Sequence, residues 1–483
     1  MKAATKLMQT HAYIDGEWVK SRNDAQFPVY NPATGDQIAQ VPDLDKEDAV
    51  QAIYAAERAF QSWKKTSPKQ RSALLKGWYQ LIMDQAEHLA TLMTTEQGKP
   101  YQESYGEVLY GASFIEWFAE EAKRGYGDTI PAAMAKNRYL TIKQPVGVVV
   151  AITPWNFPLA MITRKVGPAL AAGCTVVVKP GEDTPLTALA LAKLAEEAGI
   201  PAGVINIVTT RQVAEVGELL CTHPAVRKVS FTGSTAVGKH ILRQAADTVK
   251  KVSMELGGNA PCIVFDDADL DKAVQGALIS KYRNAGQTCV CTNRLYVHDA
   301  IYDQFISKYT AAVMQMKVGN GLTKGTDIGP LINEKAVAKV TSIVEQAIEQ
   351  GASLLLGGHR SRLGDCYYEP TILSEVNDKM DIAHQEIFGP VTTVFRFNNE
   401  AEVVEQANAT PYGLAAYFYT QNFNRIWRVS EALEYGMVGI NEGIISTEMA
   451  PFGGVKESGS GREGSKYGLD DYLEIKYLCM NIE

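Results

Sequence analysis

Short apolar runs alternate with helical segments through the middle and the later part of the chain. After residue 146, the runs GVVVAIT, TVVVKP, VINIVT, VRKVSFTG and KKVSMELG are separated by segments whose apolar residues recur at helical spacing. A second series begins with PCIVF at 261–265, includes RLYVH and extends to about residue 441. Apolar strands alternating with helices are typical of a parallel sheet that helices cover on both faces. The pattern therefore predicts two α/β domains with a cleft between them.

The two ends of the chain follow other patterns. A hairpin-like start at 13–18 is followed by apolar residues at helical spacing in 74–93 and 114–122, so the first 120 residues are predicted to be mainly helical. The stretch RYLTIKQPVGVVV (138–150) alternates before it turns continuously apolar, as strands do. The tail DDYLEIKYLCMNIE predicts a terminal strand.

Composition and charge exclude several classes of function. The chain has 483 residues, 46% of them hydrophobic and 21% charged, which suits about two to four globular domains. Its formal net charge of -8 provides no basic field for binding nucleic acid or a membrane surface. No apolar stretch approaches the roughly 18 residues of a membrane span, and the first 18 residues lack a signal-peptide or transit-peptide pattern. Because the 7 scattered cysteines do not resemble a disulfide framework, we expect a cytoplasmic protein.

One glycine pattern is misleading. Residues 459–464 (GSGREG) fit G-x-G-x-x-G, but they follow PFGGVKES rather than a strand and leave no room for a βαβ unit. We expect a flexible surface or substrate-side loop there. A better dinucleotide site follows the strand VRKVSF, where residues 232–238 open a helix whose free N–H groups can bind a pyrophosphate. A capped helix after a strand requires the same residues, so this pattern alone does not decide.

Two charged residues after the run TVVVKP lie on the same edge of the predicted sheet. Lys179 is placed to bond a ribose hydroxyl, and Glu182 to accept hydrogen bonds from the adenosine ribose diol. Since Glu182 would repel a 2′-phosphate, it favours NAD over NADP. A solvated acid in a first helical turn explains Glu182 equally well.

Two further polar residues fall where the cleft is expected. Asn156, in the turn TPWNFP, offers an amide donor of the kind that an oxyanion needs, although bonding to its own turn is the commoner role. Glu255, in MELGGN at the boundary of the two series, suits general-base work once burial raises its pKa. A structural glutamate at a strand end is the alternative.

Cys289 and Cys291 stand one residue apart in KYRNAGQTCVCTNR (281–294). A metal site is not predicted, because there is no second pair, no suitably spaced histidine and no H-E-x-x-H. A permanent disulfide across one residue would be strained, and buried structural thiols remain an alternative. A nucleophile is favoured because residues 284–287 break a helix and present Cys289 on a loop.

Taken in order, these segments resemble the NAD(P)-dependent aldehyde dehydrogenases. The resemblance rests on PWNFP, KPGEDTP, FTGSTAVG, MELGGNAP, GQTCVCTNR, EIFGP, NEG and PFGGVKESG. Within the family, SFIEWFAEEAKRGYGDTIP, SKYRNAGQTCVC and GREGSKYGLDDYLEIKY resemble the succinate-semialdehyde dehydrogenase group, with the glutarate-semialdehyde enzymes as near relatives. The resemblance implies an α/β fold in three parts and a homotetramer (a dimer of dimers). The parts are a Rossmann-type NAD-binding domain (1–128 and 148–254), a catalytic domain (255–469) and oligomerisation strands (129–147 and 470–483).

The resemblance also implies roles for single residues. Cys289 attacks the aldehyde, the Asn156 amide and the Cys289 N–H hold the oxyanion, and Glu255 activates the water that hydrolyses the thioester; Lys179 is counted with this catalytic group. The residues implied for the coenzyme, NAD with NADP possible, are Trp155, Lys179, Glu182, Gly233, Ser234, Leu256, Glu386 and Phe388.

Substrate choice is predicted to depend on two arginines. The resemblance implies that Arg164 and Arg283, with Ser446, grip the distal carboxylate of succinate semialdehyde, because guanidinium groups bind that anion bidentately. Either arginine is otherwise a surface salt-bridge partner. Glutarate semialdehyde differs by one methylene and stays an alternative. A role in 4-aminobutyrate breakdown follows from the resemblance alone.

The resemblance gives Cys291 a role as well. In some members of this group a thiol at this position forms a reversible disulfide with the nucleophile, so we expect Cys289–Cys291 oxidation to switch the enzyme off; the alternative is that Cys291 merely packs. Two other classes stay open on the residues alone, a non-redox thiol hydrolase and a non-catalytic relative.

Overall fold

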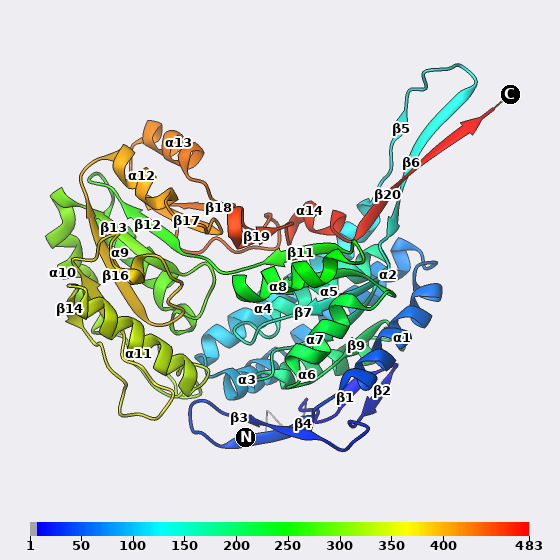
Figure 1. Cartoon of the computed structure of the whole chain (residues 1–483), viewed down its shortest axis with the longest axis horizontal. Helices are drawn as coiled ribbons and strands as arrows, with labels where there is room; N and C mark the ends of the chain where they lie inside the picture. Colours follow the sequence, from blue (N-terminus) through cyan, green and yellow to red (C-terminus); the bar gives the residue numbers. More distant parts are fainter. Residues whose placement is uncertain (1–6, 483) are drawn as a thin grey trace.

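The computed structural model of the chain describes residues 7–482. Residues 1–6, on which part of the leader-peptide argument depends, and Glu483, at the end of the predicted terminal strand, lie outside the described residues. The molecule has two lobes and a protruding arm that carries the carboxyl terminus (Figure 1). None of the helices within 7–482 is both long enough and apolar enough to cross a membrane.

The first lobe contains an eight-stranded sheet. Its central strands are parallel in the order β9-β8-β7-β10-β11, and β1, β2 and β19 extend it by antiparallel pairing. The strands are β1 (Ala12–Ile14), β2 (Glu17–Val19), β7 (Val148–Ile152), β8 (Thr175–Lys179), β9 (Ile205–Ile207), β10 (Val226–Thr232), β11 (Lys251–Glu255) and β19 (Gly459–Ser460). Chain order reverses between β7 and β10, and open α/β sheets bind ligands beyond the carboxyl ends of their strands at such a point.

Alternate residues of the central strands face two layers of helices. Val149 and Val176 pack into the core formed with α2 to α6, whereas Val148 and Val177 pack against α1, α7 and α8 on the other face. Both faces are covered, which explains why these strands read as unbroken apolar runs. The helices of this lobe are α1 (Lys46–Trp63), α2 (Pro68–Asp84), α3 (Ala86–Gln97), α4 (Tyr101–Glu121), α5 (Ala160–Ala172), α6 (Pro185–Glu197), α7 (Val213–Thr222), α8 (Thr235–Ala246) and the short α14 (Ser465–Asp470).

The second lobe is built on a seven-stranded sheet in the order β14-β15-β16-β13-β12-β17-β18, parallel except for β14. Its strands are β12 (Ala260–Val264), β13 (Thr292–His298), β14 (Ser353–Leu356), β15 (Thr371–Ser374), β16 (Val391–Phe397), β17 (Ala415–Tyr419) and β18 (Met437–Ile440). Its helices are α9 (Leu270–Tyr282), α10 (Tyr302–Val313), α11 (Glu334–Glu349), α12 (Glu400–Asn408) and α13 (Phe423–Ala432). The predicted second α/β series is confirmed.

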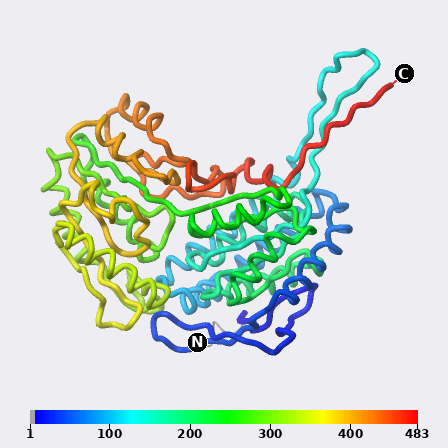
Figure 2. Tube along the Cα trace, in the orientation of Figure 1, coloured from blue at the N-terminus to red at the C-terminus, as the bar shows by residue number. Residues whose placement is uncertain are grey.

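The arm is a three-stranded antiparallel sheet in the order β20-β6-β5. β5 (Thr129–Ile130) and β6 (Asn137–Pro145) come from the middle of the chain, and β20 (Leu473–Asn481) is its terminal strand. The tube in Figure 2 shows these segments, far apart in sequence, running side by side away from both lobes. A separate hairpin of β3 (Gln26–Tyr30) and β4 (Gln37–Pro42) lies beneath the first lobe.

The misleading glycine pattern is only in part a loop. Gly459 and Ser460 form β19, which pairs with Glu255 and Met254 at the end of β11. This segment, grouped by sequence with the catalytic domain, therefore extends the sheet of the first lobe. Residues 461–464 form no helix or strand, as expected of a loop. The strand was missed because its pairing partner lies some 200 residues earlier, beyond the reach of local pattern.

Candidate active site

The loop that carries Cys289 begins where α9 ends. After Tyr282 the chain makes a tight turn in which Asn284 and Ala285 adopt left-handed conformations (φ 52° and 54°). Such conformations cost about 1–3 kcal/mol each in non-glycine residues. Buried hydrogen bonds to Asn284 offset the cost: Gln97 Nε2 donates to its Oδ1 at 3.0 Å, and its N–H donates to Glu103 at 2.7 Å. The turn predicted to present Cys289 is confirmed.

Cys289 lies where two cavities meet. One cavity, of about 260 Å³, contains Arg164, Arg283 and Ser446; the other, of about 310 Å³, contains Trp155, Ser234 and Phe388. Cys289 and Met161 line both cavities. A group bound to this sulfur is therefore accessible from two sides.

The Cys289 thiol is half-buried where the two cavities meet. Burial, together with the nearby Glu386 carboxyl group, raises the pKa of Cys289 to about 12, although Arg164 opposes the rise. The sequence argument expected a thiolate-prone sulfur, whereas these surroundings favour the thiol. A neighbouring group that removes the thiol proton would therefore assist attack by Cys289.

Asn156 is 4% exposed and lies beside Cys289 in the second cavity. Its Nδ2 donates to the carbonyl of Gln287 at 2.9 Å, which fixes the amide and leaves its second N–H free to donate. The backbone carbonyl of Asn156 accepts bonds from Lys99 Nζ at 2.7 Å and from Asn284 at 2.9 Å. The amide is thus oriented by the loop that carries the thiol.

Glu255 ends β11 and is 3% exposed. Neither carboxylate oxygen has a hydrogen-bond partner among the described residues. Burial raises the pKa of Glu255 well above its usual value and Glu463 raises it further, against the opposing fields of Arg164 and Lys165. A buried carboxyl with a raised pKa and free oxygens has the properties of a general base near neutral pH.

Arg164 belongs to α5, a helix whose residues are all buried. Its guanidinium lies over the Phe452 ring at 3.8 Å and its Nη2 lies 2.7 Å from Glu463 Oε2. Lys165 Nζ reaches the other oxygen of Glu463 at 2.5 Å. The salt-bridge alternative is therefore realised for Arg164, but in a buried network at the cavity wall rather than on the surface.

Arg283 differs from Arg164. It lines the same cavity at 5.5 Å from the Phe157 ring, and no carboxylate within residues 7–482 lies at ion-pair distance from it. Ser446 and Tyr110 also line this cavity, and the Tyr110 hydroxyl lies beside Ser446. The cavity thus holds two guanidinium groups and hydroxyls beyond the thiol.

The second cavity has the features of a dinucleotide site. Ser234 caps α8 by accepting the Val237 N–H at 3.4 Å, and the other N–H groups of the first turn are free of such a cap. A Cβ at Gly233 would meet the Phe231 ring at 2.4 Å, so this turn requires glycine. The sequence-predicted residues Trp155, Gly233, Ser234, Leu256, Glu386 and Phe388 all line this cavity.

Glu386 lines this cavity in a fixed position. Its Oε1 accepts the Gly258 N–H at 3.1 Å, and burial raises the pKa of Glu386 to about 7. The rings of Trp155 and Phe388, which line the same cavity, meet edge to face at 5.7 Å.

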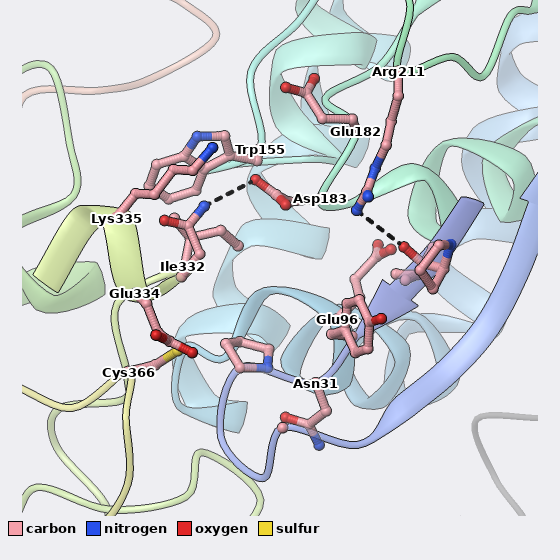
Figure 3. A pocket seen from close by; sticks show the side chains of 16 residues that line it. Asn31, Glu96, Trp155, Glu182, Asp183, Arg211, Ile332, Glu334, Lys335 and Cys366 are labelled. Atoms are coloured by element: carbon pink, nitrogen blue, oxygen red, sulfur yellow. Dashed lines mark hydrogen bonds between the residues drawn. The ribbon is translucent and has the colours of Figure 1, made fainter. Parts of the chain in front are cut away.

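Lys179 and Glu182 lie outside the two cavities that share Cys289. Lys179 Nζ bonds Glu182 at 3.1 Å, and Glu182 lines a larger neighbouring cavity of about 780 Å³ with Trp155 and Arg211 (Figure 3). Burial alone would raise the pKa of Glu182, but Lys179 outweighs it and lowers the pKa. Arg211 does not pair with Glu182. It points toward the hairpin of β3 and β4 and donates to the Pro28 carbonyl at 3.3 Å (Figure 3). Glu182 is therefore an ionised group at this edge of the sheet.

Cys291 is buried beneath the loop. Its thiol donates weakly to the carbonyls of Lys281 and Thr292, both at 3.5 Å, so it faces away from the cavities. All 7 cysteines are free thiols. Within residues 7–482, no group of three or more His, Cys, Asp or Glu side chains is placed to hold a metal.

Sequence reasoning missed four charged residues of the site. Glu463 and Lys165 form the network beside Glu255, and buried Lys99, at 2.5 Å from Glu107, supports Asn156. Glu107 in turn accepts the first N–H groups of the segment leading into α5. The one available signal was Glu463 itself, a charged residue inside the glycine pattern that had been set aside.

The chain is similar to known proteins over nearly its whole length. The profile of the aldehyde dehydrogenase family matches residues 18–478. The chain is 57% identical over 474 residues to 3-sulfolactaldehyde dehydrogenase of Pseudomonas putida, covering 98% of this chain and 97% of the relative. It is 56% identical over 478 residues to succinate-semialdehyde dehydrogenase [NADP(+)] of Escherichia coli strain K12, and 57% identical over 477 residues to glutarate-semialdehyde dehydrogenase of Pseudomonas putida KT2440, covering 99% of each chain in both cases.

A solved structure shows the same fold. Betaine aldehyde dehydrogenase of Staphylococcus aureus in complex with NAD+ superposes with a TM-score of 0.98 at 38% identity, covering 100% of this chain and 97% of the other. The predicted family and fold class are thereby confirmed. Since the family profile and full-length relatives at more than half identity span nearly every residue, the protein belongs to the aldehyde dehydrogenase family.

Proposed function

We propose that this aldehyde dehydrogenase oxidises a short aldehyde with a distal acid group, succinate semialdehyde to succinate, using NAD. One observation carries the proposal: Cys289 stands between a cavity with two arginines and a cavity with the features of a dinucleotide site. A thiol at that junction can bond to the carbonyl carbon of an aldehyde. The far end of the aldehyde then contacts an arginine in one cavity, and the other face of the carbonyl group meets a coenzyme in the other cavity.

The first half of the reaction forms a bond between Cys289 Sγ and the aldehyde carbon. The thiol proton leaves to Glu255, and the carbonyl oxygen becomes an oxyanion for which the Asn156 amide and the Cys289 N–H are the donors. A nicotinamide coenzyme bound in the second cavity supplies the hydride acceptor that turns this adduct into a thioester.

The second half hydrolyses the thioester. Glu255 first releases the thiol proton to solvent. It then takes a proton from water, the hydroxide adds to the carbonyl carbon, and the bond to Sγ breaks to release the acid, with the proton on Glu255 returning to the sulfur. The unpartnered oxygens of Glu255 and its raised pKa support this role. A non-redox thiol hydrolase would use the same residues but no coenzyme.

The second cavity and the larger neighbouring cavity, which share Trp155, together support a dinucleotide on physical grounds. The glycine turn and the free first turn of α8 suit a pyrophosphate, while Lys179 and Glu182 suit the adenosine ribose. The ionised Glu182 favours NAD over the 2′-phosphate of NADP. Because the Escherichia coli relative is named for NADP(+) and the Staphylococcus aureus structure holds NAD+, both coenzymes belong in the test.

The substrate is proposed from the same cavity. Arg283 has no ion-pair partner among the described residues, and together with Arg164 and Ser446 it provides a site for a distal anion. Relatives of equal similarity are named for succinate semialdehyde, glutarate semialdehyde and 3-sulfolactaldehyde, all aldehydes that carry an acid group. Glutarate semialdehyde is the leading alternative, and 4-aminobutyrate breakdown the pathway that succinate semialdehyde suggests.

We further propose a homotetramer in the cytoplasm, with the domain boundaries given above. The arm exposes apolar side chains on β20, including Ile475 and Tyr477, at 70% and 55%, and β18 is an uncovered edge of the second sheet. Exposed strand edges of this kind pair with other chains. The 7 free thiols suit a reducing compartment.

Cys291 is proposed as the partner in a reversible disulfide with Cys289. Peroxide would convert Cys289 to a sulfenic acid with loss of hydroxide, and the Cys291 thiol would displace water from it. Cys289 and Cys291 are separated by one residue in the sequence, but the Cys291 side chain must first turn away from the Lys281 carbonyl to reach the Cys289 sulfur.

The test is the absorbance of reduced nicotinamide with purified protein. Succinate semialdehyde, glutarate semialdehyde and butanal are each supplied with NAD and with NADP. We expect strong preference for an acid semialdehyde with NAD. Equal use of butanal would remove the substrate proposal, and no reduction of either coenzyme would contradict the oxidation itself.

A further inference from the structure

Arg164 lies between two anionic positions. On one side it lines the cavity that holds Cys289, Arg283 and Ser446. On the other side its Nη2 lies 2.7 Å from Glu463 Oε2. Its guanidinium is 1% exposed and is packed on Phe452 at 3.8 Å, so it cannot swing toward either side.

Part of the donor fork of Arg164 is unused. Its Nη2 is engaged with Glu463 Oε2 at 2.7 Å, whereas Nε has no hydrogen-bond partner among residues 7–482. A buried guanidinium with an unmet donor at a cavity wall is suited to bind an anion there. Arg164 can therefore contact a ligand while its charge still faces Glu463.

Glu463 stands next to the proposed general base. Its backbone exchanges hydrogen bonds of 2.8 Å in both directions with Phe452, and a Cβ at the next residue, Gly453, would lie 2.9 Å from Glu255 Oε1. The charged groups that act on Glu255 are Glu463, Arg164, Lys165 and Arg462, and Glu255 in turn raises the pKa of the Cys289 thiol. Glu463 is the one acid in this set.

We propose that Arg164 is shared between the distal acid group of the substrate and Glu463, so that an occupied distal site makes the Glu255–Glu463 pair a stronger proton acceptor. The idea rests on the proposed function, because it assumes that Glu255 activates water. A second anion on Arg164 adds a negative charge and divides the guanidinium between two carboxylates. Both effects favour a proton on Glu255, and a stronger base takes the proton from water more readily.

Arg164 is thereby a positioning residue for Glu463 as well as a substrate contact, and it gives the enzyme a means of selecting acid aldehydes after the covalent bond has formed. Within residues 7–482 Arg283 has no such second partner, so the two arginines have different roles. Binding affinity alone would not reveal this difference.

The experiment follows hydrolysis of the acyl-enzyme itself. The enzyme is loaded through one turnover with NAD and either succinate semialdehyde or butanal, which share a four-carbon chain, and loss of the Cys289 adduct is followed by rapid quench and mass spectrometry from pH 5 to pH 9. On the acidic side of the profile the hydrolysis rate falls as Glu255 becomes protonated; we call the pH of half-maximal rate the acid limb. We expect the acid limb to lie about half a pH unit or more higher for the succinyl adduct than for the butyryl adduct. Because the adduct is covalent, the affinity of the enzyme for the free substrate does not affect the measured rate of hydrolysis.

Variants separate the shared arginine from a direct effect of the substrate carboxylate on Glu255. In Glu463→Gln and Arg164→Met the separation between the two limbs should fall to less than half, whereas in Arg283→Met it should persist. Arg164→Lys keeps the charge without the fork and should give an intermediate separation, and circular dichroism checks that each variant is folded.

The outcomes decide between the ideas. Coincident limbs in the wild type, or a full separation in folded Glu463→Gln, would overturn the shared arginine and leave the proposed function standing. Absence of any Cys289 adduct with either aldehyde would overturn the proposed function and this inference with it.

Discussion

The two cavities that meet at Cys289 are built in different ways. The cavity proposed for the coenzyme is formed by a glycine turn and the first turn of α8 after β10, by Trp155 after β7 and by Phe388 just before β16. The substrate-side cavity is formed by buried charges from elements far apart in the chain, with Arg164 on α5 joined to Glu463 just before α14. One side relies on backbone groups and local turns, the other on a balance of charges in a dry environment.

This difference explains the chemical behaviour of the two sides. Backbone N–H groups and glycine turns bind a phosphate without burying an ionised side chain. They therefore lower the stability of the protein little when no ligand is bound. Buried charges cost desolvation free energy unless they are paired, and Glu255 is left without a partner. The substrate side should therefore respond strongly to single charge changes, and the coenzyme side weakly.

The largest effect is expected where the sides meet. Cys289→Ser should lower kcat at least about 10³-fold, because a hydroxyl in this buried site is a far weaker nucleophile than a thiol. The measurement is coenzyme reduction at saturating acid semialdehyde, with Cys291→Ala as the matched control. Retention of more than a tenth of the activity in Cys289→Ser would show that the junction is not the reacting centre.

The next effect concerns stability, with opposite signs for two carboxylates. The folded-state pKa of Glu463 is low because Lys165 and Arg164 outweigh the effect of burial, so ionised Glu463 stabilises the fold above its unfolded pKa and this is lost as the pH falls through the folded pKa. The folded-state pKa of Glu255 is raised by burial, so its contribution is present at low pH and is lost as the pH rises through the folded pKa.

At pH 8, Glu463→Gln should therefore lower the free energy of unfolding by about 3 kcal/mol, because it leaves two buried cations unpaired. Glu255→Gln should raise it by about 1 kcal/mol, because it removes an unpartnered buried charge. Thermal melts at pH 8 and pH 5 measure both. Equal changes of the same sign would contradict the contrast between the paired and the unpaired acid.

The contrast between a cavity built from local turns and a cavity built from distant charges also determines how much the sequence could predict. The alternating strands, the helix opening at Ser234 and the loop before Cys289 were predicted because each depends on residues a few positions apart. The Lys165–Glu463 bond joins residues 298 positions apart, and the strand that brings them together, β19, has only two residues. Local pattern therefore found residues that line one cavity around Ser234, whereas it gave no sign that Arg164 meets Glu463.

A smaller effect separates the two arginines. Arg283→Met should lower the ratio of kcat/KM for succinate semialdehyde over butanal by about 10- to 100-fold, the range expected for a lost charge-assisted hydrogen bond. Arg360→Met, an exposed arginine away from both cavities, is the control for loss of one positive charge. An unchanged ratio would mean that Arg283 does not contact the distal acid.

The smallest effect is expected on the coenzyme side. Glu182→Gln keeps the size of the side chain and removes its charge, so the preference for NAD over NADP in kcat/KM should fall about tenfold, which corresponds to about 1.4 kcal/mol of lost repulsion. Lys179, released from its 3.1 Å bond to Glu182, would then be free to meet a 2′-phosphate. Glu197→Gln, an exposed acid on α6, makes the same change in net charge away from the site and should leave the preference as it is. If both variants shift the preference equally, net charge rather than the position of Glu182 sets it; if neither does, the coenzyme side depends on backbone groups alone, and the contrast between the two cavities is sharper than proposed.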